Sequence, residues 1–252
     1  MARVSARPTP GVRPARPHAS FTPEGRRVRE VLSYSRRGAR LSEREQDAWD
    51  RLAERWVVPE ERVEDTPWSH WFGREAPLVV EVGSGVGETL AAVAPRHPEL
   101  DFLAFEVWRP GVAGALWRLE QAGAENVRLV DVDAAWSLMH LFPAGSVAEL
   151  WTFFPDPWPK NRHHKRRLVQ PAFARAVASA LAPGGCWRLA TDWADYAEQA
   201  RAVIDAEPSL SGGVTARWAE RPMTRFERRG VEEGRAVTDL TYRRAPAASR
   251  GH

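Results

Sequence analysis

Residues 153–167, FFPDPWPKNRHHKRR, place a single carboxylate beside a dense group of positive charges. Asp156 stands in an aromatic turn stiffened by proline. It is followed by five cationic side chains and two histidines: Lys160, Arg162, Lys165, Arg166 and Arg167, with His163 and His164. Cations just past a buried strand, with aromatic rings able to stack on a base, suit an RNA substrate. The same run also fits a solvated charged segment at the start of a helix.

The adjacent histidines are a poor basis for a metal site. On a helix His163 and His164 diverge by about 100°, and no third ligand stands near them in the sequence. The single cysteine, Cys186, cannot anchor a cysteine-based zinc site and leaves no partner for an intramolecular disulfide. It also fits a reducing cytosol. We therefore expect a cytoplasmic protein without a metal ion or a disulfide.

A glycine-rich turn follows a buried strand. The run PLVVEVG, residues 77–83, is typical of a strand covered on both faces. The chain continues as Gly83-Ser84-Gly85-Val86-Gly87-Glu88. The dinucleotide fingerprint requires glycine at its first, third and sixth positions, and the sixth position here is Glu88. The glycines alone are also compatible with a tight turn that has only a structural role.

Carboxylates end the next expected strands as well. Glu106 closes the second strand, Asp131 and Asp133 close the third, and Asp156 follows the fourth. The carboxyl ends of parallel strands form the edge at which open α/β sheets bind ligands. We therefore expect these acids to line a common cleft.

This acidic edge favours one class of cofactor. A dinucleotide would bring a pyrophosphate next to Glu81 and Glu88, where like charges repel in a partly dry cleft. S-adenosyl-L-methionine has no phosphate. It carries a sulfonium, an amino group, two ribose hydroxyls and an adenine amine, all of which suit an acidic cleft. We expect S-adenosyl-L-methionine rather than a nicotinamide cofactor.

Length and charge set the broad class. The chain has 252 residues and a net charge of +3, and 43% of its residues are hydrophobic. Residues 1–40 hold ten arginines against Glu24 and Glu30, a net of +8, so the other residues sum to −5. No run approaches a membrane span. The N-terminus lacks the apolar stretch of a secretory signal and has some transit-peptide character, but residues 1–27 are predicted to be a disordered basic arm.

The hydrophobic pattern alternates between strands and helices, which predicts a doubly wound, mostly parallel sheet. Seven strands are expected, over residues 77–83, 101–108, 126–133, 148–154, 186–192, 214–220 and 238–244. The last two are expected to pair antiparallel around a polar loop. Helices are expected over 28–55, 88–97, 111–123, 168–185 and 193–207, with Ser42 and Glu45 as a possible capping box. This pattern predicts one domain over residues 28–244, followed by a short C-terminal tail over residues 245–252.

Six segments, taken in order, resemble the bacterial tRNA (guanine-N7-)-methyltransferase family: VEVGSGVGE, LAFEVW, VDVDA, FFPDPWPKNRHHKRR, ATDW and RPMTRFERRG. The resemblance runs from about Val28 to Arg244. It implies a class I, Rossmann-like S-adenosylmethionine-dependent methyltransferase that modifies guanine 46 in the variable loop of tRNA. The glycine turn is shared by many methyltransferases, whereas the basic block and the T-x-F-E segment are more specific.

The resemblance also implies site residues. Cofactor contacts fall on Glu81, Gly83, Gly85, Glu106, Asp133 and Asp156. Asp131 competes for the third-strand acid, but the Asp-Ala step favours Asp133. Asp156 is in addition the implied catalytic residue. Substrate contacts fall on Lys160, Asp192, Thr224, Arg225, Phe226 and Glu227. Arg162, Lys165, Arg166 and Arg167 are expected on the RNA backbone. On composition alone, the TRFE segment is an ordinary loop.

The implied chemistry explains why one acid stands among cations. Guanine N7 has a free lone pair at neutral pH, so catalysis consists of alignment and of negative charge placed where positive charge develops. Asp156 either supplies that charge or orients the guanine edge, and the cations hold the phosphates. Three alternatives remain: methylation of another RNA site, a non-catalytic RNA-binding protein, and an NAD-dependent dehydrogenase. The sequence does not indicate whether the protein is a monomer or an oligomer.

Overall fold

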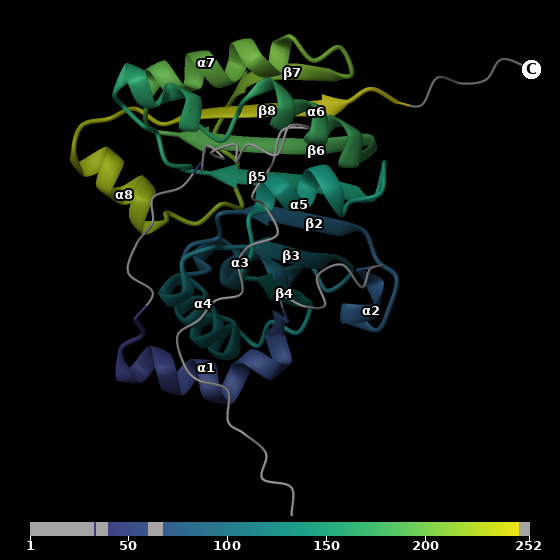
Figure 1. The fold of residues 1–252 in the computed structure, drawn as a ribbon, viewed down its shortest axis with the longest axis vertical. Coiled ribbons are helices and arrows are strands. Elements are labelled where there is room, and N and C mark those ends of the chain that lie inside the picture. The colour runs from purple at the N-terminus through teal and green to yellow at the C-terminus, as the bar shows by residue number, and fades with distance from the viewer. Residues whose placement is uncertain (1–32, 34–39, 60–67, 247–252) are drawn as a thin grey trace, which may run out of the picture.

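The computed structural model describes residues 33, 40–59 and 68–246. The described residues form one eight-stranded sheet in the order β1-β4-β3-β2-β5-β6-β8-β7, which runs through the molecule in Figure 1. The strands are β1 (Val57–Val58), β2 (Leu78–Val82), β3 (Asp101–Phe105), β4 (Val127–Val130), β5 (Val147–Phe153), β6 (Leu181–Thr191), β7 (Leu210–Thr215) and β8 (Thr238–Arg244).

Parallel pairing joins β1 through β6, whereas β8 runs antiparallel to both β6 and β7. Every residue of β2 and β3 is buried. Full burial of this kind requires helices on both faces, because a parallel sheet has no solvated side. The doubly wound, mostly parallel architecture expected from the alternating pattern is confirmed.

Helices cover both faces of the sheet: α1 (Glu43–Trp56), α2 (Ser69–Phe72), α3 (Glu88–Val93), α4 (Arg109–Ala122), α5 (Ala134–His140), α6 (Pro171–Ala180), α7 (Ala194–Asp205) and α8 (Arg225–Glu232), with 3₁₀ helices η2 (Ala94–Arg96) and η3 (Asn161–Arg166). Leu52 of α1, Leu90 of α3 and Leu116 of α4 share one buried apolar cluster. Phe173 of α6 and Ile204 of α7 belong to the cluster on the other face.

Local sequence signals explain several element ends. The Ser42 side chain accepts from the backbone N–H of Glu45, and the Glu45 carboxylate accepts from the Ser42 N–H at 2.7 Å, so the capping box at the start of α1 is confirmed. Gly123 ends α4 with a φ of 64°, in the left-handed region that glycine adopts without strain.

Four expectations about elements were wrong. The sheet has an eighth strand, because the two-residue β1 is too short to give a pattern. Helix α6 ends at Ala180, since Leu181 already pairs with Val147 of β5. The strand expected over 214–220 is β7, Leu210–Thr215, which pairs with β8 through Gly212 and Gly213. The loop expected around TRFE is instead the start of helix α8.

The expected arm over residues 1–27 and most of the expected helix before Glu43 lie outside the described residues. Of the expected C-terminal tail, the structure describes only residues 245 and 246. Within the described ranges, no helix is both long and apolar enough to cross a membrane.

Candidate active site

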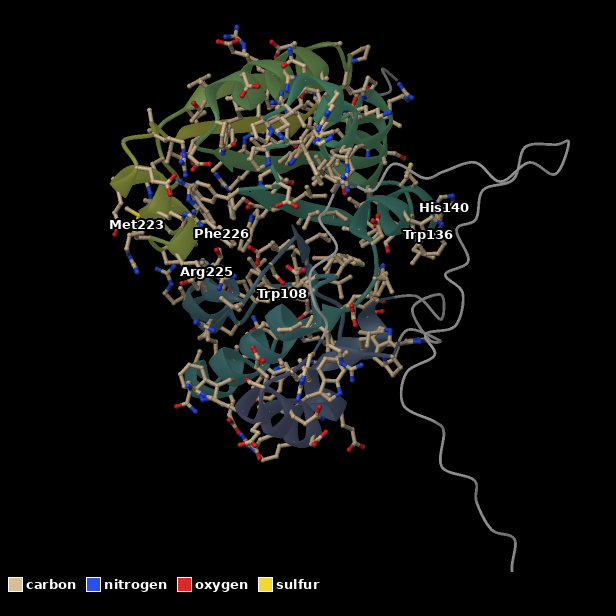
Figure 2. All side chains as sticks on the ribbon, turned by 60° about the vertical axis from the view of Figure 1, so that its left-hand side comes forward. Trp108, Trp136, His140, Met223, Arg225 and Phe226 are labelled. Carbon is tan, nitrogen blue, oxygen red and sulfur yellow. The ribbon has the colours of Figure 1, made fainter. Side chains whose placement is uncertain are left out.

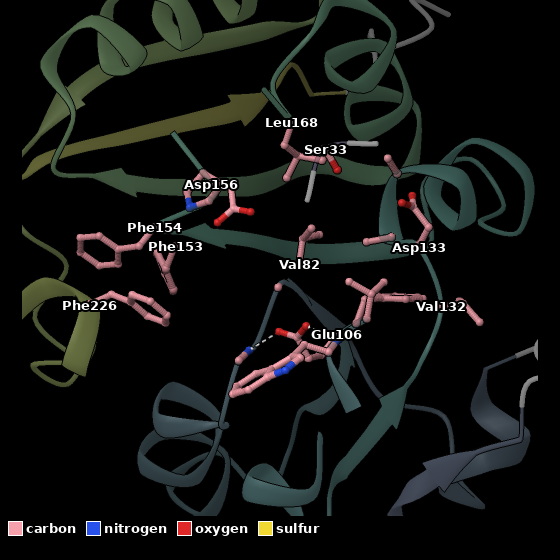
Figure 3. A pocket seen from close by; sticks show the side chains of 18 of the residues that line it. Ser33, Val82, Glu106, Val132, Asp133, Phe153, Phe154, Asp156, Leu168 and Phe226 are labelled. Carbon is pink, nitrogen blue, oxygen red and sulfur yellow. Dashed lines mark hydrogen bonds between the residues drawn. The ribbon is translucent and has the colours of Figure 1, made fainter. Parts of the chain in front are cut away.

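A cleft opens at the carboxyl ends of β2, β3, β4 and β5, the edge that the sequence predicted (Figure 3). Its empty volume is about 900 Å³, including open solvent at the mouth. Seven of the predicted site residues line it: Gly83, Gly85, Glu106, Asp133, Asp156, Arg225 and Phe226. Apolar walls complete it, among them Val82, Phe105, Val107, Val132 and Leu168.

The glycine turn between β2 and α3 has a backbone that larger residues would strain. Gly85 has a φ of 57° and Gly87 a φ of 74°. A Cβ on Gly87 would also lie 2.8 Å from the Cβ of Ala115 in α4. The third glycine of the turn is therefore fixed by packing as well as by backbone conformation.

Glu106 joins the end of β3 to this turn. One carboxylate oxygen accepts from the N–H of Gly85 at 2.8 Å, and the other accepts from the N–H of Trp108 at 2.7 Å. Its side chain points into the cleft in Figure 3, where the bond to Gly85 is drawn. The carboxylate expected for ribose is thus held by two backbone donors.

Glu81 is buried and does not belong to the lining of the cleft. The residue is 4% exposed, and its Oε2 atom finds no hydrogen-bond partner among the described residues. Burial, with repulsion from Glu106 in second place, raises the pKa of Glu81 to about 8. This buried carboxyl therefore lacks the compensating positive group that a bound ligand could bring.

The third-strand acid in the cleft is Asp133. It is the N-cap of α5, and its side chain accepts from the N–H of Trp136 at 3.0 Å. Asp131, the competing acid, does not belong to the lining of the cleft. The structure therefore places the Asp-Ala step at the site, in a short helix that the hydrophobic pattern did not predict.

Asp156 lies in a turn with unusual backbone angles. Phe154 and Trp158 both have positive φ values, 50° and 44°, which non-glycine residues adopt at a cost of about 1–3 kcal/mol each. Between them, Asp156 is half-buried and directs its carboxylate into the cleft (Figure 3). The strained turn fixes the direction in which the single acid of the FPDPW segment points.

The basic turn after Asp156 presents most of its cations to solvent. Lys160, Arg162 and Lys165 are exposed on and beside η3. Arg166 lies with its guanidinium carbon 3.5 Å from the centroid of the Trp158 ring. None of these four lines the described cleft. They form instead a cationic surface next to it.

Arg167 was wrongly expected on the RNA backbone. It is 2% exposed, and its guanidinium donates to the carbonyl of Pro157 at 2.9 Å and to the side chain of Gln199 at 3.0 Å. It also forms an ion pair with Asp195. A phosphate cannot reach a guanidinium enclosed in this way, so Arg167 fastens the turn to α7.

Helix α8 brings only part of its predicted substrate set into the cleft. Thr224 caps the helix by accepting from the N–H of Glu227. Glu227 is 1% exposed, and both its oxygens accept from Arg217 and Arg221. Arg225 and Phe226 face the cleft instead. Thr224 and Glu227 thus hold the helix in place.

Asp192 lies under α8, outside the lining of the cleft. It accepts from Arg235 at 2.8 Å, and a Cβ on Gly230 would approach its Oδ2 to 2.5 Å. Gly230 therefore allows the helix to sit directly on this acid. Asp192 therefore packs against the helix that carries Arg225 and Phe226, and its carboxylate does not line the cleft.

Two residues of the site were missed in the sequence. Trp108 lines the cleft two residues after Glu106, and its place in LAFEVW was the available signal. Arg221 is buried below α8, with its guanidinium 5.3 Å from the ring of Phe153 and 5.5 Å from that of Phe154. Arg221 thus connects Glu227 of α8 to the end of β5, which leads to Asp156. No local sequence pattern predicts that contact.

The side chains that line the cleft fit S-adenosylmethionine. Glu106, Asp133 and Asp156 offer carboxylates to hydroxyl and amine groups, and the apolar walls suit a flat adenine. Glu81 is buried outside the lining of the cleft, and its Oε2 atom has no hydrogen-bond partner among the described residues. Over the described ranges, no group of three or more His, Cys, Asp and Glu side chains could hold a metal ion. Cys186 is buried and carries a free thiol.

Comparisons with known proteins agree with this geometry. The family model described as "Putative methyltransferase" matches residues 75–240, more than half of the chain. A tRNA (guanine-N(7)-)-methyltransferase of Nocardioides sp. is 61% identical over 240 residues, covering 94% of this chain and 97% of the relative. The enzyme of the same name from Cutibacterium acnes is 48% identical and covers 87% of this chain and 86% of its own.

Among solved structures, the 16S rRNA methyltransferase KamB superposes with a TM-score of 0.51 at 17% identity. It covers 87% of this chain and 100% of its own, which shows the same fold. With close relatives over nearly the full length and the predicted motifs gathered at one cleft, the chain belongs to the tRNA (guanine-N7-)-methyltransferase family.

Proposed function

We propose that this protein transfers a methyl group from S-adenosyl-L-methionine to N7 of guanine 46 in the variable loop of tRNA, in the cytoplasm. The observation that carries the proposal is the junction of two surfaces. A cleft lined by Glu106, Asp133 and Asp156 borders the exposed cations of the basic turn. An acidic pocket suits a cationic cofactor, and a cationic rim suits a polyanion.

The cofactor would lie against the glycine turn. Gly83 and Gly85 let the backbone approach closely. Glu106 and Asp133 would accept from its hydroxyl and amine groups. Glu81 lies outside the lining, and a positively charged group bound nearby would favour ionisation of its buried carboxyl. S-adenosylmethionine supplies an electrophilic methyl group on a positively charged sulfur. A dinucleotide is disfavoured because a pyrophosphate would face several carboxylates at once.

The catalytic task left to the protein is alignment and charge stabilisation. Guanine N7 offers a free lone pair, so no residue needs to remove a proton from it. As the ring accepts a methyl group it becomes cationic, and Asp156 would face that positive charge from the fixed turn. The carboxylate can also accept from the N–H groups of the guanine edge and so orient the base.

The RNA would be held beside the cleft. Lys160, Arg162, Lys165 and Arg166 present cations on one short segment next to Asp156. Phosphate contacts made there position the nucleic acid without reading its sequence. Arg225 and Phe226, at the start of α8, line the cleft as well. The acid then faces the base while the cations face the backbone.

A transfer assay tests this function. Purified protein is incubated with methyl-labelled S-adenosylmethionine and either bulk tRNA or ribosomal RNA. Label in tRNA is the expected result. Label in ribosomal RNA alone would mean that another RNA is the substrate. No transfer, together with salt-sensitive tRNA binding, would mean a non-catalytic RNA-binding protein. Binding of NAD with exclusion of S-adenosylmethionine would indicate a dehydrogenase.

A further inference from the structure

Three flat side chains meet at the mouth of the cleft from two separate parts of the fold. Trp108 follows β3, whereas Arg225 and Phe226 begin α8 (Figure 2). The guanidinium carbon of Arg225 lies 5.9 Å from the centroid of the Trp108 ring and 4.7 Å from that of the Phe226 ring. All three line the cleft that contains Asp156.

The backbones that carry these groups are each held by a glutamate that belongs to the glycine turn or is hydrogen-bonded to it. The N–H of Trp108 donates to Glu106, and the N–H of Arg225 donates to Glu88 Oε2 at 3.0 Å. A Cβ on Gly85 would lie 3.8 Å from Phe226 Cε2, so the helix faces the glycine turn directly. Both segments are therefore tied to the glycine turn, while the exposed side chain of Arg225 can adjust.

That distance is close to what a flat ring needs. A planar ring between two planar groups makes two contacts of about 3.5 Å, which requires about 7 Å between the outer groups. The present 5.9 Å between guanidinium and indole is about 1 Å short. Arg225 is exposed, so its long side chain can supply that movement. Indole and guanidinium planes are both groups on which bases stack.

We propose that Trp108 and Arg225 form the two walls of a stacking slot for a purine of the RNA, namely the guanine that accepts the methyl group. This inference rests on the proposed function, and it assigns Trp108 a role in holding the substrate base. A guanine in the slot would share the cleft with Asp156. A guanine flipped out of the RNA stack loses contact with the neighbouring bases, and Trp108 and Arg225 would replace that stacking contact.

A second role for Arg225 makes a different prediction. If Arg225 only contacts a phosphate, lysine can replace it, because a point charge suffices. If Arg225 stacks on a base, Arg225→Lys keeps the charge but loses the plane. Likewise Trp108→Phe keeps an aromatic face and Trp108→Ala removes it. Arg228→Lys is the matched control, since Arg228 is exposed on the same helix and lies outside the lining.

The test measures equilibrium binding of two tRNA transcripts, one intact and one abasic at the target guanine, to each variant. The wild type and Arg228→Lys are expected to bind the abasic tRNA about tenfold more weakly, as befits one stacked base. Trp108→Ala and Arg225→Lys are expected to lose most of that difference, and Trp108→Phe to keep most of it. Calorimetry with S-adenosylmethionine is expected to give unchanged cofactor affinity.

The stacking slot would be contradicted if every variant, like the wild type, still bound the abasic tRNA about tenfold more weakly than the intact tRNA. A large fall in cofactor affinity in Trp108→Ala with no change in the tRNA difference would contradict it as well, because the wall would then serve the adenine of the cofactor. Failure of the proposed function is seen separately, as absence of methyl transfer by the wild type. The binding experiment reports on the base whether or not transfer occurs.

Discussion

The carboxylate of Glu106 and the N–H of Gly85 are 2.8 Å apart, so the acid at the end of β3 holds the glycine turn after β2. Glu106→Gln keeps the shape but removes the charge that we assign to cofactor binding. The affinity for S-adenosylmethionine should fall by about 10- to 100-fold, the value of one charge-assisted hydrogen bond. Calorimetry measures it. Asp131→Asn, which alters an acid outside the cleft, is the control and should change affinity little.

The second prediction concerns the charge of Asp156. Asp156→Asn should lower the single-turnover rate at saturating tRNA and cofactor by roughly 10² to 10³, because one preorganised electrostatic group is removed. Lys160→Ala should instead raise the apparent KM for tRNA while the saturated rate holds. A wild-type rate for Asp156→Asn under saturation would leave Asp156 with a binding role alone.

The third prediction separates exposed from buried cations in the basic turn. If Arg162 and Lys165 hold phosphates, replacing both with alanine should make the plot of log affinity against log salt shallower, by about 0.7–0.9 for each phosphate that is no longer neutralised. Arg167→Ala removes a buried guanidinium with several partners. It should lower the free energy of unfolding by about 1–3 kcal/mol.

The measurements are filter binding of tRNA over a salt series and urea unfolding of each variant. An unchanged slope for the double variant would make the exposed cations ordinary solvated surface. A changed slope for Arg167→Ala, with its stability intact, would contradict the buried role of that residue.

Glu81 gives a prediction about pH. Its pKa is raised to about 8 in the folded protein, whereas a glutamate in an unfolded chain titrates near 4.3. Between these values the folded state holds a proton that the unfolded state has released, so the free energy of unfolding falls as pH rises. The contribution of this group should decline by about 1.4 kcal/mol per pH unit.

Urea unfolding without cofactor, from about pH 5 to about pH 8, measures this effect against Glu81→Gln, which does not titrate. The stability of the wild type relative to the variant should decrease steadily across that window. A difference that stays constant with pH would show that Glu81 is already ionised in the folded protein.

Much of this site was predictable because buried parallel strands have a simple pattern. The runs that became β2 and β3 are mostly apolar and wholly buried. Gly85, Glu106 and Asp156 follow the carboxyl ends of β2, β3 and β5, and they meet at one cleft. The order of these segments in the chain was enough to bring the acids to one edge.

Side-chain direction was not predictable in the same way. Arg167 and Arg166 are neighbours, yet Arg167 turns inward because Gln199 and Asp195, on α7, accept from it. Glu227 is withdrawn from the cleft by Arg217 and Arg221. Such partners are set by tertiary packing, so a motif names the residues without saying which of them face the ligand.

Locating the transferred methyl group tests the proposed reaction most directly. An unmodified tRNA transcript with guanine at position 46 is incubated with the wild-type protein and labelled S-adenosylmethionine, then digested to nucleosides and separated by mass. We expect to find the label as 7-methylguanosine, and we expect it to disappear when guanine 46 is replaced by adenine. Label in any other nucleoside, or label that survives the replacement, would contradict the proposed reaction.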